Sequence, residues 1–356
     1  MVENLSEIFI RLDNVVRDAI TTINRNEQGI ALVVDEEQRL LGTITDGDIR
    51  RAILAGEDLS SPIQVLLDQR PASPYPEPIT ARVGSSAADL LKLMKEKFVK
   101  QLPLLDKEGR VIDLVTMEDL LPDDALPLKA VIMAGGYGTR LSPLTKEIPK
   151  PMLPVGDRPL MEYTVDQLKR VGIKNVSIST HYLTEQISEY FGDGSDFGVE
   201  INYIKEEHPL GTAGALGLMD TPEEPLLVIN GDILTKVDFR SMLAFHKKHM
   251  ADLTVGVRQY EMEVPYGVLD CDGPIVVHLS EKPRHSFLVN AGIYLLEASV
   301  FSYIPHNEYI NMTDLIDKLL EEHRKVVSFP ILEYWLDIGQ PLDYKKAQED
   351  LENGRV

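Results

Sequence analysis

A glycine-rich segment with basic neighbours is the first part of the chain whose residue types could do chemistry. It reads Gly-Gly-Tyr-Gly-Thr-Arg-Leu over residues 135–141 and directly follows an apolar run at residues 129–134. Glycines let backbone N–H groups approach phosphate oxygens, because no Cβ stands in the way. Arg140 adds a fork of donors that suits phosphate oxygens, and Lys150 adds a compact positive charge. The segment therefore indicates binding of a triphosphate.

Two common phosphate-binding motifs are excluded by the same segment. A P-loop needs Gly-Lys-Ser/Thr, which is absent, and a dinucleotide fingerprint starting at Gly136 would need a glycine in place of Leu141. A simple turn after a strand is the structural alternative, since glycines also serve tight turns. The string continues through Lys-Glu-Ile-Pro-Lys-Pro-Met-Leu-Pro-Val at residues 146–155, and as a whole it is more specific than its glycines alone.

Two aspartates far apart in the chain follow or end short apolar segments. Asp232 ends Asn-Gly-Asp after the run at residues 226–229, and Asp337 lies in Trp-Leu-Asp-Ile-Gly at residues 335–339. Carboxylates at such places suit Mg²⁺, which prefers oxygen ligands and keeps several waters. Taken singly, each aspartate also fits a turn. Beside a triphosphate-binding segment, the two carboxylates favour a metal-dependent reaction at phosphate.

The bulk composition limits the partners of the chain. With 36 basic and 57 acidic residues among 356, the formal charge is −21, which argues against nucleic acid or an anionic membrane as a partner. The acidic N-terminus is unlike a secretory signal, and no apolar run is long enough to span a bilayer. The single cysteine, Cys271, fits a reducing compartment. We therefore expect a cytoplasmic protein whose anionic substrates meet a locally basic or metal-bound site.

The elements that must position these residues alternate in type beyond residue 127. Helical patterns at residues 160–171 and 239–249 separate apolar strand candidates, which lie at residues 129–134, 175–179, 226–229 and 253–257. This alternation predicts one α/β domain with a mostly parallel sheet covered on both faces. Ligands of such sheets bind at the carboxyl ends of the strands, where the glycine-rich segment and Asp232 both fall.

The first third of the chain contains an internal repeat with an offset of 71 residues. Residues 31–49 align without gaps to residues 102–120, and Asp18 in the preceding helical stretch aligns with Asp89. The identical pairs include Asp35/Asp106, Glu37/Glu108, Arg39/Arg110, Thr45/Thr116 and Asp48/Asp119. Each copy predicts a helix, a strand, a turn at Asp-x-x-x-Arg, a second strand and a helix capped at Thr-x-x-Asp. The proline-rich residues 70–78 indicate a connector, and residues 121–127 indicate a linker.

This repeat resembles a tandem pair of CBS domains, with copies at about residues 10–65 and 79–122 of a domain spanning residues 1–124. In that family a Thr/Ser-x-x-Asp element often holds the ribose of an adenine nucleotide. The matching positions are Thr45, Asp48, Thr116 and Asp119. The alternative is that these residues only cap helices and that the pair serves for dimerisation. The resemblance implies a regulatory or dimerising module, with an adenine nucleotide as its candidate ligand, in a homo-oligomer of at least two chains.

From about residue 129 to the C-terminus, the chain resembles the sugar-1-phosphate nucleotidylyltransferases. The resemblance implies a Rossmann-like, mostly parallel α/β domain over residues 128–356. In that family the glycine-rich loop and the downstream lysine hold the triphosphate, and a Leu-Gly-Thr-Ala-Gly segment lies against the base. The matching nucleotide-binding positions are Ala134, Gly135, Gly136, Gly138, Thr139, Arg140, Gly211, Thr212 and Ala213.

The same resemblance implies the other site residues. A metal-binding aspartate at two places matches Asp232 and Asp337, which with Arg140 and Lys150 form the expected catalytic set. The positions that match the sugar-phosphate pocket are Tyr266, Gly267, Glu281, Lys282, Asn290 and Gly292. Glu281 would accept hydrogen bonds from sugar hydroxyls and Lys282 would bind the sugar's phosphate. Without the resemblance, this pair would be interpreted as a solvated surface ion pair.

The expected reaction is transfer of a nucleotidyl group from an NTP to a sugar 1-phosphate, with release of pyrophosphate. A CBS pair ahead of the catalytic domain resembles guanylyltransferases that form GDP-amino sugars for legionaminic acid pathways, which implies GTP and glucosamine 1-phosphate. Mannose, glucose or heptose 1-phosphate with another NTP stay open. A catalytically silent, CBS-linked regulatory subunit is the alternative from another class. The enzyme is favoured because the charged residues are all present, namely Arg140, Lys150, Asp232, Lys282 and Asp337.

Overall fold

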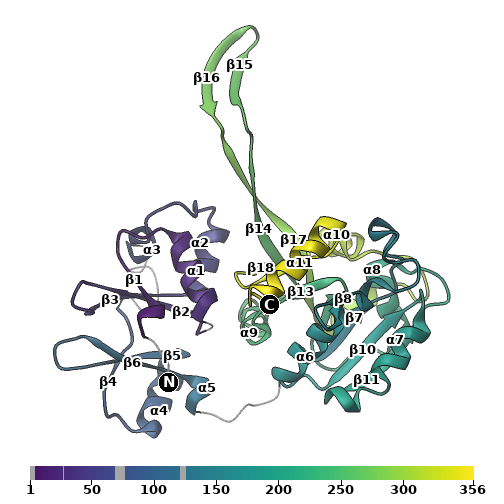
Figure 1. Cartoon of the computed structure of the whole chain (residues 1–356), viewed down its shortest axis with the longest axis horizontal. Helices are drawn as coiled ribbons and strands as arrows, with labels where there is room; N and C mark the ends of the chain where they lie inside the picture. The colour runs from purple at the N-terminus through teal and green to yellow at the C-terminus, as the bar shows by residue number, and fades with distance from the viewer. Residues whose placement is uncertain (1–4, 27, 69–76, 121–125) are drawn as a thin grey trace. The chain divides into compact units, whose positions relative to one another are not determined.

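The computed structural model describes residues 5–26, 28–68, 77–120 and 126–356. The chain divides into two compact units, Met1–Asp124 and Ala125–Val356, each of which is described by itself (Figure 1). Most of the expected connector at residues 70–78 and of the expected linker at residues 121–127 lies outside the described residues, as do residues 1–4. Within the described ranges, no helix has both the length and the apolar character needed to cross a membrane.

The second unit is built on a seven-stranded sheet with the order β11-β10-β7-β12-β17-β14-β18. Its strands are β7 (Lys129–Met133), β10 (Asn175–Thr180), β11 (Glu200–Lys205), β12 (Leu226–Asn230), β14 (Leu253–Glu263), β17 (Arg284–Leu296) and β18 (Val326–Pro330). Strand β17 runs antiparallel to both of its neighbours, whereas the other pairings are parallel. The expected mostly parallel sheet is confirmed.

Helices and short strands surround this sheet. The helices are α6 (Leu160–Arg170), α7 (Thr184–Phe191), α8 (Gly211–Gly214), α9 (Phe239–His249), α10 (Met312–Glu321) and α11 (Pro341–Glu352). The short 3₁₀ helices are η3 (Thr139–Leu141), η4 (Lys150–Met152), η5 (Ser195–Phe197), η6 (Ala215–Leu218) and η7 (Ala298–Tyr303). Two small antiparallel pairs join β8 (Pro154–Val155) to β9 (Arg158–Pro159) and β13 (Ile233–Thr235) to β19 (Trp335–Asp337).

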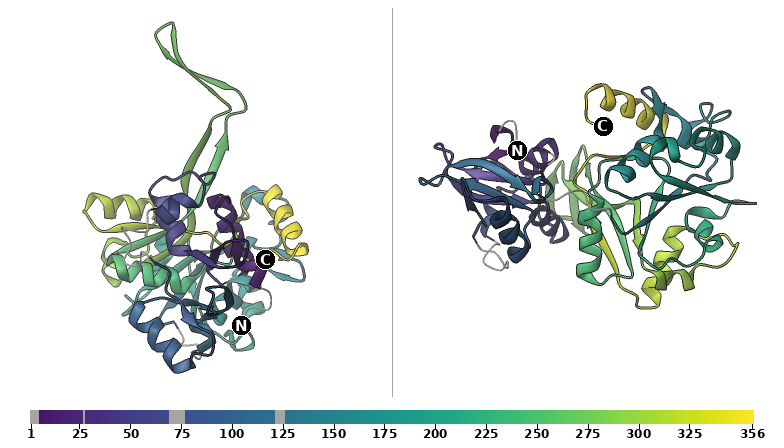
Figure 2. Two further views of the ribbon diagram at one scale, coloured as in Figure 1. Left: turned by 90° about the vertical axis from the view of Figure 1, so that its left-hand side faces the viewer. Right: turned by 90° about the horizontal axis from the view of Figure 1, so that it is seen from below.

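A two-stranded arm leaves this unit, as Figures 1 and 2 show. Strands β14 and β17 continue beyond the sheet into β15 (Gly267–Asp272) and β16 (Ile275–Glu281), which pair with each other. None of residues 261–290 is buried. The apolar pattern predicts a strand only over residues 253–257. It does not show that this strand continues beyond the edge of the sheet. The residues that follow mix polar and apolar side chains, and because none of residues 261–290 packs into a core, the sequence shows no burial pattern that would predict their pairing.

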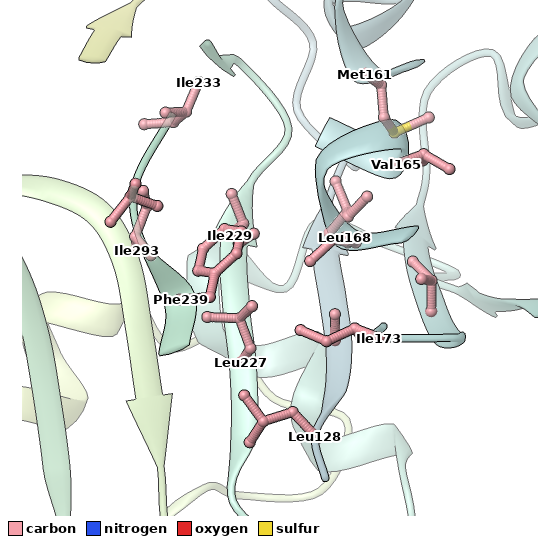
Figure 3. Close-up of a cluster of buried hydrophobic side chains, with 14 of the residues drawn as sticks. Leu128, Met161, Val165, Leu168, Ile173, Leu227, Ile229, Ile233, Phe239 and Ile293 are labelled. Carbon is pink, nitrogen blue, oxygen red and sulfur yellow. The ribbon is translucent and has the colours of Figure 1, made fainter. Parts of the chain in front are cut away.

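The core shows why the central strands are so apolar. Leu227 and Ile229 of β12 pack on the side covered by α6 and α9, together with Phe239 (Figure 3). Leu226 and Val228 pack on the opposite side, where α10 contributes apolar residues. A strand buried on both faces needs a continuous apolar run rather than an alternating one. Burial on both faces therefore holds the end of β12 firmly in place.

The first unit repeats one arrangement at the offset read from the sequence. Its first copy contains η1 (Leu5–Ile8), β1 (Phe9–Ile10), α1 (Val16–Asn26), β2 (Ile30–Val34), β3 (Leu40–Thr45), α2 (Asp46–Leu54) and α3 (Gln64–Asp68). The second contains β4 (Ala81–Arg82), α4 (Ala87–Lys97), β5 (Gln101–Leu105), β6 (Val111–Thr116) and α5 (Met117–Leu120). Adding 71 to the bounds of α1, β2 and β3 gives those of α4, β5 and β6. The predicted order of elements in each copy is confirmed.

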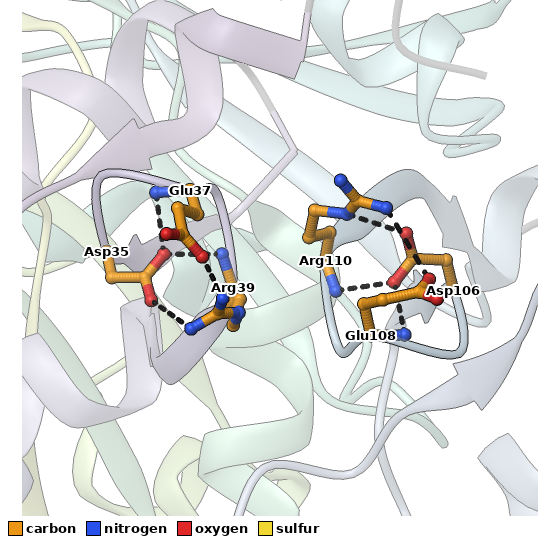
Figure 4. A network of polar contacts seen from close by, with 6 residues as sticks. All are labelled: Asp35, Glu37, Arg39, Asp106, Glu108 and Arg110. Carbon is orange, nitrogen blue, oxygen red and sulfur yellow. Dashed lines mark hydrogen bonds and ion pairs between the residues drawn. The ribbon is translucent and has the colours of Figure 1, made fainter.

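The Asp-x-x-x-Arg turns are built alike in the two copies (Figure 4). Asp35 Oδ1 accepts a hydrogen bond of 2.8 Å from the N–H of Arg39, and Asp106 Oδ1 accepts one of 2.8 Å from the N–H of Arg110. Each aspartate also forms an ion pair with its arginine side chain. The identical residues of the repeat therefore serve the local geometry of the turn.

These turns also join the two copies. The N–H of Leu40 donates to the carbonyl of Gly109 at 3.1 Å, and the N–H of Val111 donates to the carbonyl of Gln38 at 3.0 Å. Beneath this pairing, both copies contribute to one cluster of buried residues, namely Ile8, Ile30, Leu32, Val34, Val111 and Leu114. The shared core explains why the repeat occurs as a pair within one compact unit.

Candidate active site

The glycine-rich loop lies directly after β7 and wraps over the residues that follow it. Gly138 has a φ of +64°, and a Cβ added there would stand 2.9 Å from Thr145 Cγ2 and 3.1 Å from Lys150 Cβ. The Thr145 hydroxyl also donates to the Gly138 carbonyl at 2.8 Å. Glycine is therefore required at position 138 by both conformation and space.

Lys150 lies beneath this loop at the start of η4, and it is only 7% exposed. Its ammonium group donates to the carboxylate of Asp232. A buried charge needs a partner, because desolvation without compensation is costly. This contact brings the predicted phosphate-binding lysine and the first predicted metal-binding aspartate together.

The two predicted metal-binding aspartates lie at the ends of a strand pair: Asp232 directly precedes β13, and Asp337 is the last residue of β19. Strand β13 pairs antiparallel with β19 so that Ile233 lies opposite Asp337, and the N–H of Ile338 donates to the carbonyl of Asp232 at 3.0 Å. Burial and the nearby Asp232 carboxylate raise the pKa of Asp337, against the opposing charges of Lys150 and Arg140. Burial, more than the neighbouring carboxylate, is thus the main cause of the raised pKa of Asp337.

Three oxygens in this corner fit a divalent cation. Asp232 Oδ1, Asp337 Oδ1 and Asn230 Oδ1 are buried, and none has a hydrogen-bond partner among the described residues. Within the same described part of the chain, no cluster of three or more His, Cys, Asp or Glu residues could hold a metal. Two carboxylates are nevertheless sufficient for Mg²⁺, which completes its shell with water and substrate phosphates.

A cavity of about 190 Å³ joins the loop to the aspartate corner. It is lined by Gly136, Gly138, Thr139, Arg140, Leu141, Lys150, Asp232 and Gly339. A Cβ added to Gly339 would stand 3.5 Å from Arg140 Nη1 and 3.7 Å from Asp337 Oδ1, so both groups lie near this glycine. A larger hollow of about 440 Å³ beside η7 holds none of the predicted site residues. The predicted catalytic set is therefore gathered around the smaller cavity.

The predicted base-binding segment forms α8 and is tied to the chain ahead of α10. Gly211 has a φ of +79°, and a Cβ added there would meet the Ile310 carbonyl oxygen at 2.6 Å. The N–H of Ala213 donates to this same carbonyl at 3.1 Å, and the Thr212 hydroxyl accepts from the N–H of Met312 at 2.8 Å. The segment is therefore held rigidly, while its contact with a nucleobase stays a prediction.

Glu206 is a residue of this region that sequence reasoning missed. It is 5% exposed, and its carboxylate accepts from the Ser179 hydroxyl at 2.9 Å and from the N–H of Leu210 at 3.0 Å. A Cβ on Gly135 would stand 2.5 Å from Glu206 Oε1. One carboxylate thus lies between the glycine-rich loop and the start of the Leu-Gly-Thr-Ala-Gly segment. Its position directly after a strand was the available signal.

The predicted sugar-phosphate residues lie in two places. Tyr266, Gly267, Glu281 and Lys282 lie on the arm, where all four are exposed. Asn290 and Gly292 lie on the part of β17 closer to the sheet, where a Cβ on Gly292 would stand 2.6 Å from Asn230 Nδ2. Of these six residues, Gly292 is the one whose surroundings include Asn230, two residues before Asp232.

In the first unit, the Thr-x-x-Asp residues make the same contacts in both copies. Asp48 Oδ2 accepts from the Thr45 N–H at 2.9 Å and from its hydroxyl at 2.8 Å. Asp119 Oδ2 accepts from the Thr116 N–H and hydroxyl, both at 2.8 Å. Both pairs therefore stabilise the starts of α2 and α5, and a nucleotide ligand at these residues stays a prediction.

Comparison with known proteins agrees with this division. A nucleotidyl transferase family model matches residues 129–354, and a CBS domain model matches residues 3–55 and 74–122. D-glycero-alpha-D-manno-heptose 1-phosphate guanylyltransferase of Aneurinibacillus thermoaerophilus is 36% identical over 64% of this chain and 99% of that protein. A mannose-1-phosphate guanylyltransferase of Mycobacterium tuberculosis is 33% identical over 63% of this chain, which spans 65% of that protein's length.

A solved structure agrees as well. The crystal structure of HddC from Yersinia pseudotuberculosis is 28% identical and covers 63% of this chain and 99% of its own, with a TM-score of 0.50. The loop, the lysine and the paired aspartates described above lie within residues 129–354, which the family model matches. The chain therefore belongs to the nucleotidyl transferase family, as an enzyme that carries a tandem pair of CBS domains ahead of its transferase domain.

Proposed function

We propose that the chain transfers a guanylyl group from GTP to a sugar 1-phosphate and releases pyrophosphate. The observation that carries the proposal is one cavity in which Arg140 and Lys150 face the Asp232 and Asp337 corner. Relatives named as guanylyltransferases support GTP as the nucleotide. The cavity lies where nucleotides bind in open α/β sheets, at the carboxyl ends of β7 and β12.

The reaction needs positioning and charge neutralisation more than proton transfer. An oxygen of the sugar phosphate is already anionic, so it attacks the α-phosphorus of GTP without a general base. A bond forms between this oxygen and phosphorus, and the bond to the β-phosphate oxygen breaks, so pyrophosphate leaves with the electron pair. Arg140, which is exposed at the cavity, would hold the leaving pyrophosphate. Lys150 would stabilise charge around the α-phosphate from beneath the loop.

The aspartate corner would hold Mg²⁺ through Asp232 and Asp337. When bound, the cation supplies positive charge between the crowded phosphates. The chain's own part is to keep the two carboxylates together, one directly before β13 and one at the end of β19, with Lys150 as their cationic neighbour. The unpartnered oxygens of both aspartates support this assignment.

For the sugar, our candidate is glucosamine 1-phosphate, supported by the combination of a CBS pair with a transferase domain. Heptose and mannose 1-phosphates are the competing substrates, because the relatives are named for them. We further propose that the CBS unit regulates or dimerises the enzyme, with an adenine nucleotide as its candidate ligand near Asp48 and Asp119. A cytoplasmic location belongs to the same proposal, and the single cysteine supports it.

Pyrophosphate release tests the proposal. The full chain is incubated with each of four NTPs and with glucosamine, mannose, glucose or heptose 1-phosphate, first with Mg²⁺ and then with EDTA. Release that requires GTP, one sugar phosphate and the metal is the expected result. No release from any pair would instead favour a silent regulatory chain. Repeating the productive reaction with AMP, ADP, ATP and GTP added as effectors tests the CBS unit.

A further inference from the structure

The arm of residues 260–288 exposes an unusual amount of apolar surface. Ten of its apolar side chains are between 42% and 73% exposed, namely Tyr260, Met262, Tyr266, Leu269, Ile275, Val276, Val277, Leu279, Phe287 and Leu288. A two-stranded ribbon without other cover is marginally stable in water, and its edges leave backbone groups unpaired. An apolar surface of this extent indicates a partner. The arm is therefore built to be covered.

One face of the arm carries apolar side chains beside a predicted site residue. Across the β15–β16 ladder, Leu269 lies opposite Leu279 and Gly267 lies opposite Glu281. A Cβ on Gly267 would stand 2.9 Å from Glu281 Oε2 and 3.2 Å from Leu279 Cδ1, so these side chains share a face. Lys282 follows directly, with a φ of +48° and its N–H donating to the Tyr266 carbonyl at 3.2 Å. Any surface that covers this face also meets Glu281 and its neighbours.

The active site of the same chain lacks these groups. Its cavity presents two cationic side chains, and one of them, Lys150, already pairs with Asp232. A second phosphate-bearing substrate adds negative charge at this cavity, and Lys282 would offset it. Figures 1 and 2 show β15 and β16 projecting away from the sheet that carries the cavity. Each chain thus has one incomplete site and one arm that bears the missing residues.

We propose that the arm docks on a second copy of this chain and places Tyr266, Glu281 and Lys282 in that copy's active site. Exchange of an identical element about a two-fold axis completes both sites at once and covers both arms. No other protein is needed, because each site receives the arm of the partner chain in place of its own. That the arm completes the site rests on the proposed function, whereas the exposed apolar surface that needs a covering partner does not.

Complementation between two defective chains tests the exchange. Lys150→Ala damages the cavity and leaves the arm intact, whereas Lys282→Ala damages the arm and leaves the cavity intact. The two variants are produced together with different affinity tags, and the mixed dimer is purified. Exchange predicts one complete site in each mixed dimer, and hence about half of the wild-type rate. If the arm serves its own chain, the mixed dimer stays inactive and the proposal is overturned.

The reciprocal pair is the matched control. A chain carrying both substitutions is combined with a wild-type chain, so that the mixed dimer holds the same number of substitutions. Exchange now predicts almost no activity, because the intact cavity receives the damaged arm. An arm that serves its own chain predicts about half of the wild-type rate. If the wild-type protein is active but the two mixed dimers show the opposite activities, the exchange is rejected and the proposed function stands.

A cross-linking readout decides the question even where wild-type protein shows no turnover. Cys271 is the chain's single cysteine, and it is exposed on β15. It is labelled with a photoreactive maleimide, the products of one-chain and two-chain mass are separated on a denaturing gel, and each is mapped by mass spectrometry. Links from Cys271 to the transferase domain of another chain are expected. Links only within one chain, or links to an unrelated protein in place of a second copy, would overturn the proposal.

Discussion

Asp232 and Asp337 are held together by the backbone, since Ile233 pairs with Asp337 and the N–H of Ile338 donates to the Asp232 carbonyl at 3.0 Å. The closeness of the two carboxylates therefore does not depend on their side chains. Each keeps one buried oxygen without a hydrogen-bond partner among the described residues. Backbone pairing of this kind forces two negative groups into one corner, and a divalent cation would relieve their repulsion.

Substitution of this corner should separate stability from catalysis. Asp337→Asn removes a carboxyl group whose pKa is raised by burial and by the nearby Asp232 carboxylate. We expect turnover to be lost, because a carboxylate ligand is gone, while the fold persists. In a thermal melt, Mg²⁺ should raise the Tm of the wild-type protein and leave that of Asp337→Asn nearly unchanged. An equal Mg²⁺ shift in both proteins would place the cation elsewhere.

Lys150 should contribute both to turnover and to the stability of the fold. Lys150→Ala is expected to lower kcat by about 100-fold or more, as for other preorganised charge stabilisers. The variant also leaves the Asp232 carboxylate without its cationic partner, so its Tm is measured alongside. Lys248→Ala is the control, because Lys248 is exposed at the end of α9. Near-normal turnover by a folded Lys150→Ala protein would reject the assignment.

Gly138 should be intolerant of any side chain. Gly138→Ala forces a Cβ to within 2.9 Å of Thr145 at a φ of +64°, so it should destabilise the protein by about 1 kcal/mol or more. Gly136→Ala in the same loop adds a Cβ with no neighbour within 4 Å and should leave the Tm unchanged. Comparison of the two melting temperatures checks the conformation of the loop. Equal melting temperatures would contradict it.

Glu206 should act as a positioning residue for nucleotide binding. Glu206→Ala leaves the N–H of Leu210 without its acceptor, at a cost of about 1–3 kcal/mol in stability. Since Leu210 begins the segment that would meet the base, the KM for the nucleotide should rise more than kcat falls. Glu206→Gln keeps an acceptor and should recover part of this loss. A variant that changes kcat alone would argue for a direct role in the reaction.

His246 predicts an acid limit to stability. Its imidazole is fully buried and hydrogen-bonded to Thr254 and Glu297, and burial lowers its pKa despite the opposing effect of Glu297. The unfolded chain therefore takes up this proton first, at about pH 6.5. The free energy of unfolding should fall as the pH drops below that value. Denaturant unfolding at pH 8 to 5 checks this, and His246→Gln should flatten the decline over the same range.

Much of the fold could be predicted from the sequence because its signals are local or repeated. The apolar run of β12 and the helical pattern of α6 appear within a few residues of their observed bounds. The offset of 71 carries over to the bounds of three elements. The aspartate corner was harder, because nothing in the spacing of Asp232 and Asp337 shows that β13 pairs with β19. Its prediction depended on a family resemblance.

Two features could not be reached in this way. Glu206 stands in a polar stretch beside Glu207, and only the approach of Gly135 and Leu210 in the fold distinguishes it. The direction of the arm is likewise a property of the sheet, since β14 and β17 look like ordinary strands residue by residue. Long-range packing decides both features; for Glu206 the sequence offers only a place directly after a strand, which does not show what its carboxylate contacts.

The most direct test of the central claim is to identify the products of one reaction. The full chain is mixed with GTP, Mg²⁺ and the sugar 1-phosphate selected by the pyrophosphate assay, and the mixture is followed by ³¹P NMR. The account predicts equal amounts of pyrophosphate and a GDP-sugar, with loss of the sugar monophosphate resonance. Inorganic phosphate with an unchanged sugar phosphate, or no change at all in the spectrum, would contradict it.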